Sequence, residues 1–130
     1  MENKYYFSKV LDGSFEGAIE KVTDSLKTEG FGIVTEVDIK ATMKNKLNVD
    51  FRNYKILGAC NPSYAYKALS AEDKIGTMLP CNVIVQEIEA GKVEVAAVDP
   101  IASMMAIQNP LLNDIATEVR EKLKRVIENL

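Results

Sequence analysis

The stretch 82-NVIVQEIEAGKVEVAAV-98 decides the class of fold. Residues 82–88 and 93–98 have the composition of β-strands, and Ala90-Gly91-Lys92 between them is typical of a hairpin turn. Asp99-Pro100 ends the second strand, because a proline cannot donate a hydrogen bond to a sheet ladder. The stretch therefore predicts two antiparallel strands that are neighbours in one sheet.

Two amphipathic helices are predicted on either side of this hairpin in the sequence. Apolar residues recur at helical spacing over 15–26, and Ser14 stands where a side chain can cap the first turn. A longer apolar stripe runs over 112–130. Its charged residues alternate in sign, which predicts a solvated outer face with Glu118–Lys122 and Glu121–Arg125 pairs. We expect this last helix to lie across the sheet.

Three more strands and two short helices complete the expected order. Residues 31–39 alternate with a period of two, which predicts a strand with one buried face. Strands are also predicted at 5–10 and up to Cys60, and short helices after Asp38 and after Asn61-Pro62. Asn61 is placed to cap the second of these helices. Taken as a single domain over 1–130, this order predicts an α+β fold, a mainly antiparallel sheet of about five strands with helices on one face.

Composition and charge exclude several classes of protein. The chain has 130 residues, a net charge of −3 and a pI of about 5.1, so it lacks the basic face of a nucleic-acid binder. No stretch approaches the roughly 20 apolar residues that span a bilayer, and the N-terminus has no apolar signal core. Two cysteines are too few for a secreted disulfide framework. We therefore expect a soluble cytoplasmic protein with no nucleic-acid or membrane partner.

The chain contains no histidine. This removes Ser-His-Asp and Cys-His catalysis, His-based zinc sites and the commonest general base at neutral pH. Carboxylate, lysine and thiol chemistry remain open. On balance the sequence favours a protein that is not an enzyme, assigns no catalytic residue and gives no reason to expect a cofactor.

Two cysteine motifs are the strongest candidates for a site. Cys60-Asn61-Pro62 ends one predicted strand, and Leu79-Pro80-Cys81-Asn82 opens the next. If these strands are antiparallel neighbours, the two sulfurs lie close together despite their separation in the sequence. A helix that starts after Cys60 would favour its thiolate. The alternatives are a redox pair, a soft-metal site completed by a methionine such as Met104, or two buried cysteines that only fill the core.

Polar residues beside these motifs are the other candidates for a binding site. Asn82 follows the second cysteine and, like Asn61, has an amide that can bind a polar ligand or pin a loop. Asp99 precedes Pro100, where an aspartate most often initiates a turn. The candidate ligand-binding set is therefore Cys60, Asn61, Pro62, Cys81, Asn82 and Asp99, with Cys60, Cys81 and Met104 as the weaker metal alternative.

The motifs occur in an order that resembles a known family. The stretches Gly30 to Asp38, Tyr54 to Pro62, Leu79 to Val83 and Val98 to Pro100 together are similar to the family called domain of unknown function 302. The resemblance covers nearly the whole chain. It implies a single copy of the fold of the TATA-box-binding protein, in which a curved antiparallel sheet grasps a long C-terminal helix, with extra short helices. It also implies homodimers, but no reaction.

Two functional hypotheses follow from these residues. The first is a small-ligand-binding or regulatory domain, because a curved sheet with a helix across it can leave a pocket between them. The cysteine motifs would form the polar end of that pocket. The second is a thiol redox enzyme or a soft-metal protein of the copper type that uses Cys60 and Cys81 directly.

Overall fold

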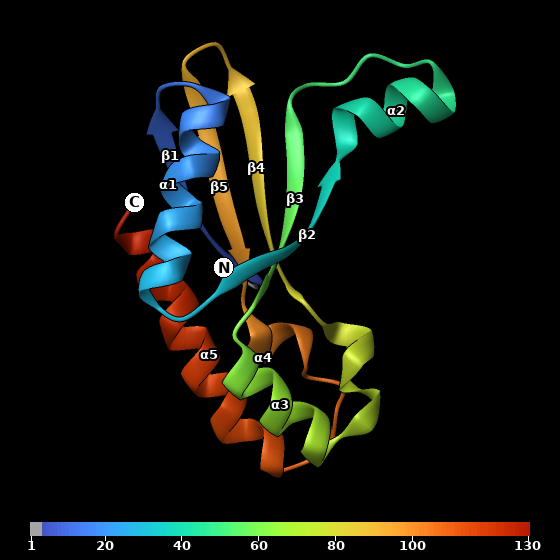
Figure 1. The fold of residues 1–130 in the computed structure, drawn as a ribbon, viewed down its shortest axis with the longest axis vertical. Helices are drawn as coiled ribbons and strands as arrows, with labels where there is room; N and C mark the ends of the chain where they lie inside the picture. The colour runs from blue at the N-terminus through green and yellow to red at the C-terminus, as the bar shows by residue number, and fades with distance from the viewer. Residues whose placement is uncertain (1–3) are drawn as a thin grey trace.

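The computed structural model describes residues 4–130 and contains one five-stranded sheet with helices against it (Figure 1). The elements follow one another as β1 (Tyr6–Asp12), α1 (Phe15–Thr28), β2 (Gly32–Asp38), α2 (Ile39–Leu47), β3 (Tyr54–Cys60), α3 (Pro62–Ala71), the 3-10 helix η1 (Asp73–Met78), β4 (Cys81–Glu89), β5 (Lys92–Val98), α4 (Pro100–Ser103) and α5 (Leu111–Glu128). No helix within residues 4–130 is long and apolar enough to cross a membrane.

The strands lie in the order β1-β5-β4-β3-β2, and each of the four neighbouring pairs is antiparallel. The hairpin predicted at 82–98 is the β4–β5 pair, in which Val85 lies opposite Val95. The predicted α+β class, the antiparallel sheet and the C-terminal helix across it are confirmed.

One face of the sheet is covered by α1 and α5, which lie side by side (Figure 1). Inward-facing side chains of alternate strand positions meet the apolar stripes of both helices, which is the pattern that period two predicts. Ser14 accepts a hydrogen bond from the backbone N–H of Gly17 at 2.9 Å, so its expected capping of α1 is confirmed. The fully buried members of this core include Val22, Leu26, Val83, Val95 and Leu123.

A second, smaller core lies where α3 and η1 pack against the beginning of α5. Its buried residues are Ala68, Ile75 and Leu112. Figure 1 shows α3 and α4 at the end of the sheet where β4 begins and β5 ends, opposite the end that carries α2. This arrangement leaves a space between the main core and the smaller one, and that space positions the candidate site.

One detail of the sequence interpretation in this region is wrong. β2 was expected to bury one face, but six of its seven residues are exposed, because α1 and α5 do not extend over this edge of the sheet. In α3, Tyr66 does not face the core and is 76% exposed. Instead Tyr64, Ala65 and Ala68 face the space beneath the helix.

Candidate functional site

A cavity of about 270 Å³ lies between the two cores, where the ends of β3 and β4 meet α3 and α5. Its walls are almost wholly apolar. The residues that line it come from six elements and the loops beside them: Phe31, Val34, Ala59, Cys60, Asn61, Tyr64, Ala65, Ala68, Leu69, Leu79, Pro80, Cys81, Pro100, Met104, Ile115, Ala116 and Val119.

Both cysteines border this cavity from neighbouring strands. Cys81 lies opposite Ala59 in the β3–β4 pair, and Cys60 is the next residue along β3. Opposed Cα atoms of antiparallel strands are about 4.5–5.5 Å apart and consecutive ones about 3.8 Å, so the Cα atoms of Cys60 and Cys81 are at most about 9 Å apart. Both thiols are free. The antiparallel pairing therefore brings the two cysteines to the border of one cavity, as the sequence suggests.

The two thiols differ in their surroundings. Cys81 is buried, whereas Cys60 is half-buried. Burial, with a smaller contribution from the nearby Cys60, raises the pKa of the Cys81 thiol from 9.0 to about 11. Cys81 therefore keeps its proton at neutral pH and is a weak nucleophile.

Asn61 lines the cavity, but it does not cap α3 as expected. Its side-chain amide Nδ2 donates to the backbone carbonyl of Glu29 at 3.1 Å, and no side-chain capping bond forms at this helix. Glu29 ends α1 next to the start of α3, and the Asn61 side chain turns its Nδ2 toward the Glu29 carbonyl. It therefore does not turn back over its own helix, where its Oδ1 would accept the capping bond. Asn61 thus joins two helices at the edge of the cavity.

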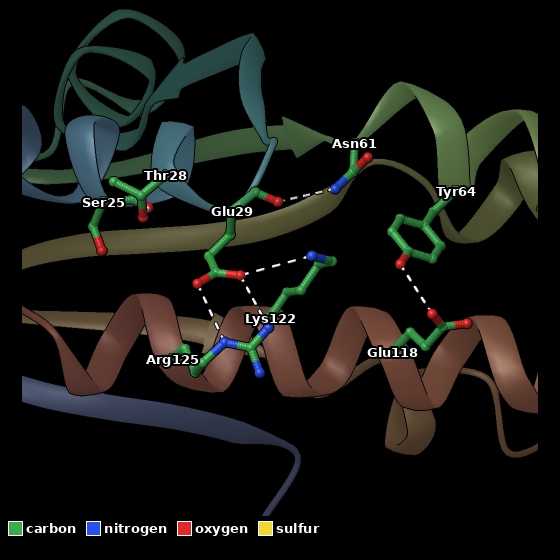
Figure 2. A network of polar contacts seen from close by, with 8 residues as sticks. All are labelled: Ser25, Thr28, Glu29, Asn61, Tyr64, Glu118, Lys122 and Arg125. Atoms are coloured by element: carbon green, nitrogen blue, oxygen red, sulfur yellow. Dashed lines mark hydrogen bonds and ion pairs between the residues drawn. The ribbon is translucent and has the colours of Figure 1, made fainter.

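A polar network at this edge joins α1, α3 and α5 (Figure 2). The carboxylate of Glu29 accepts two hydrogen bonds from the guanidinium of Arg125, at 3.2 and 3.0 Å, and lies 3.8 Å from the ammonium of Lys122. These contacts lower the pKa of Glu29, with the bond from Arg125 as the largest cause. The i,i+4 pairs expected along α5 are replaced by these bonds to α1.

Tyr64 connects this network to the cavity. Its ring forms part of the cavity wall, and its hydroxyl donates to Glu118 at 3.1 Å (Figure 2). The bond to Glu118 is the largest cause of a raised pKa of Tyr64, which keeps the hydroxyl protonated. The ammonium groups of Lys67 and Lys122 lie 5.5 and 5.9 Å from the centre of the ring, within the range of cation–π attraction.

Three of the predicted site residues lie outside the cavity. Asn82 is exposed and borders a groove on the opposite face of the sheet, because neighbouring residues of a strand point to opposite faces. Pro62 begins α3 and is exposed. Asp99 is buried, but it accepts a hydrogen bond from the backbone of Ile101 and pairs with Arg120 at 3.2 Å. Its contacts are those of a structural turn and cap residue.

Met104, the weaker metal candidate, does line the cavity, whereas its neighbour Met105 is 78% exposed and does not. Two thiols and one thioether therefore border a single apolar space. Within residues 4–130 no group of three or more carboxylate or cysteine side chains could hold a metal ion.

Sequence reasoning missed the polar edge of the site. Tyr64 is one helical turn from Asn61-Pro62 and could have been found by placing that turn on the same side as the motif. The contact between Glu29 and Arg125 joins residues 96 positions apart and has no local signal in the sequence.

Comparison with known proteins agrees with this architecture. The model of the family described as "Domain of unknown function DUF302" matches residues 7–130. A solved structure described as "Crystal structure of uncharacterized conserved protein DUF302 from Bacillus stearothermophilus" has a TM-score of 0.86 and 26% sequence identity, and the match covers 95% of this chain and 96% of that one. No curated protein matches the sequence.

Proposed function

Since this chain belongs to the family described as domain of unknown function DUF302, we propose that it is a small-ligand-binding domain that takes up a mainly apolar molecule. The ligand occupies the cavity beside Cys60 and Cys81. The observation that carries the proposal is an apolar space of about 270 Å³ at the point where both cysteine motifs meet. A cavity of roughly 150 Å³ lined by apolar side chains already binds benzene, so this one has room for a larger molecule.

The chemistry of the walls supports binding rather than catalysis. The raised pKa of Cys81 leaves a neutral thiol, and the amide of Asn61 is engaged with Glu29. The walls therefore offer apolar contact with few polar groups, and each buried CH₂ of a ligand contributes about 0.8 kcal/mol there. A ligand stabilises the state that binds it, so a ligand in this cavity stabilises the packing of α3 on α5. In a regulatory role, the ligand concentration would set how much of the protein has this packing.

A cavity-filling variant tests the proposal. Ala65 lies on α3 against the cavity, so Ala65→Phe is expected to fill the space and abolish saturable binding of the neutral fluorescent probe N-phenyl-1-naphthylamine. Ala41→Phe on the exposed side of α2 is the matched control and should bind as the wild type does. Equal binding by the wild type and Ala65→Phe would reject the cavity as the site.

We also propose that the protein works as a homodimer, as the resemblance to its family implies. Apolar side chains that no helix covers support this: Val10 and Val37, on edge strands, are 50% and 43% exposed. Light scattering should give about twice the chain mass of 14.4 kDa. A mass of one chain at high micromolar concentration would contradict the dimer.

A soft-metal site is the second candidate, favoured by the three sulfur-bearing residues Cys60, Cys81 and Met104 around one cavity. Thiolate and thioether ligands select Cu(I). Against it, the raised pKa of Cys81 makes its thiolate costly to form. In a Cu(I) competition assay with bathocuproine, Met104→Leu should weaken binding while Met105→Leu does not. Identical affinity in both variants would remove the methionine from the site.

A further inference from the structure

The polar edge of the cavity carries two ammonium groups with few partners. Lys67 follows Tyr64 by three residues on α3, and Lys122 faces the same ring from α5. Within residues 4–130 Lys67 has no ion-pair partner, and the contact of Lys122 with Glu29 is 3.8 Å long, beyond hydrogen-bond range. Lys122 is also partly buried, with 26% of its side chain exposed.

The carboxylates of this edge already have their partners. Glu29 accepts two hydrogen bonds from Arg125, and Glu118 accepts the hydroxyl of Tyr64 (Figure 2). Glu29 is in addition the ion-pair partner of the Lys122 ammonium, at 3.8 Å. Among the residues that the structure describes, no group accepts a hydrogen bond from Lys67 or Lys122, so both ammonium groups have donors left for an acceptor outside the protein.

We propose that the ligand of this cavity is an anionic amphipathic molecule, with an apolar body between α3 and α5 and a single carboxylate-type head beside Tyr64, held by Lys67 and Lys122. This proposal rests on the ligand-binding function proposed above and names the class of its ligand. Because the ring of Tyr64 is both a wall of the cavity and within 6 Å of both ammonium groups, a head group that leaves the cavity beside the ring meets them.

The cost of burying a charge favours a ligand with its apolar body in the cavity and its charged head at the edge. The cavity wall has almost no polar group to satisfy a buried charge, and an unpaired buried charge is costly. The charge must therefore lie at the edge, where a partly buried ammonium loses less water and is screened less than one on the open surface. A neutral head group of the same length gains the same apolar burial but not the charge pairing.

Isothermal titration of the full chain with octanoate and with 1-octanol tests the proposal. Both probes have the same chain length, and at pH 7 only octanoate is charged. The wild type should bind octanoate at least about fivefold more tightly than 1-octanol, and this preference should shrink as salt is raised. Equal affinity for both probes would overturn the anionic head while leaving the cavity site intact. Failure of both probes to bind would overturn the cavity site as well.

Lysine-to-methionine variants identify which lysines cause the preference for octanoate. Methionine removes the charge but keeps an apolar stem of similar length. Lys122→Met and Lys67→Met should each reduce the preference for octanoate to about twofold or less, with the affinity for 1-octanol unchanged. Lys124→Met, two positions along α5, is the matched control and should keep the full preference. An equal loss in Lys124→Met would assign the preference to overall charge and overturn the assignment to this edge.

Discussion

The side-chain amide of Asn61 donates to the backbone carbonyl of Glu29 at 3.1 Å, and so joins the start of α3 to the end of α1. The same two residues belong to the edge of the cavity, Asn61 in its wall and Glu29 through its bonds to α5. The second cysteine motif, around Cys81, borders the same space from β4. The packing of three helices at this point therefore shapes the candidate site.

Replacing Asn61 with alanine should destabilise the protein by about 1 kcal/mol, because a carbonyl of α1 loses its partner and a typical buried hydrogen bond contributes that much. The measurement is the free energy of unfolding in urea. Asn82→Ala is the matched control, since Asn82 is exposed on the other face of the sheet, and it should change stability by less than about 0.5 kcal/mol. Equal losses would show that the bond between α3 and α1 is unimportant.

Gly58 should tolerate no side chain. A Cβ at this position would overlap Thr35 on β2 and come within 2.6 Å of Pro80, which lines the cavity. Gly58→Ala should therefore cost about 1–3 kcal/mol, the usual range for overpacking. Thermal unfolding of Gly32→Ala supplies the control, because a Cβ at Gly32 meets nothing within 4 Å. Comparable melting temperatures for the two variants would contradict the crowding.

Cys81 should resist modification in the folded protein. Iodoacetamide at pH 7 is expected to alkylate Cys60 and leave Cys81 unmodified, because burial holds the Cys81 thiol in its protonated form. Mass spectrometry of peptides after a time course measures both rates. Faster labelling of Cys81 than of Cys60 would contradict this assignment.

The same pKa predicts how stability depends on pH. The folded pKa of Cys81 is raised from 9.0 to about 11, so its contribution is complete below pH 9 and is lost as the pH rises toward 11. The free energy of unfolding should therefore fall more steeply over this interval in the wild type than in Cys81→Ala. Cys60→Ala should retain the steep fall. A shallow fall in Cys60→Ala would show that Cys60, and not Cys81, causes the pH dependence.

The contribution of Glu29 to stability should change with pH in the opposite direction. Its folded pKa is lowered by Arg125, so its contribution is present above the ordinary value of 4.5 and is lost as the pH falls through the folded value. Glu29→Gln should lower the melting temperature at pH 7, and this difference should disappear in acid. Glu20→Gln on the exposed side of α1 should have little effect at either pH. A Glu29→Gln deficit that persists at low pH would point to packing rather than charge.

Local patterns in the sequence predicted the elements and the antiparallel sheet, because period, turns and caps are encoded within a few residues. They also predicted that Cys60 and Cys81 approach each other, since an antiparallel pair brings the end of one strand to the start of the next. Asn82 was grouped with Cys81 because the two are adjacent in sequence, although alternation along β4 sends them to opposite faces.

Contacts between elements that are distant in the sequence could not be predicted in the same way. A capping bond and a bond to another helix are both available to the amide of Asn61, and the position of α1 decides between them. The exposure of β2 likewise depends on how far α1 and α5 extend over the sheet. The alternating pattern of β2 does not indicate this. The edge formed by Tyr64, Lys67 and Lys122 exists only once α3 lies against α5.

Amide chemical shifts of labelled protein, titrated with 1-octanol, test the ligand-binding cavity most directly, because they report both occupancy and location. We predict saturable shift changes that cluster at Cys60, Tyr64, Ala68 and Val119, around the cavity, and that vanish in Ala65→Phe. Changes that do not saturate, or that cluster on the opposite face of the sheet around Ile84 and Ala96, would contradict a ligand site between α3 and α5.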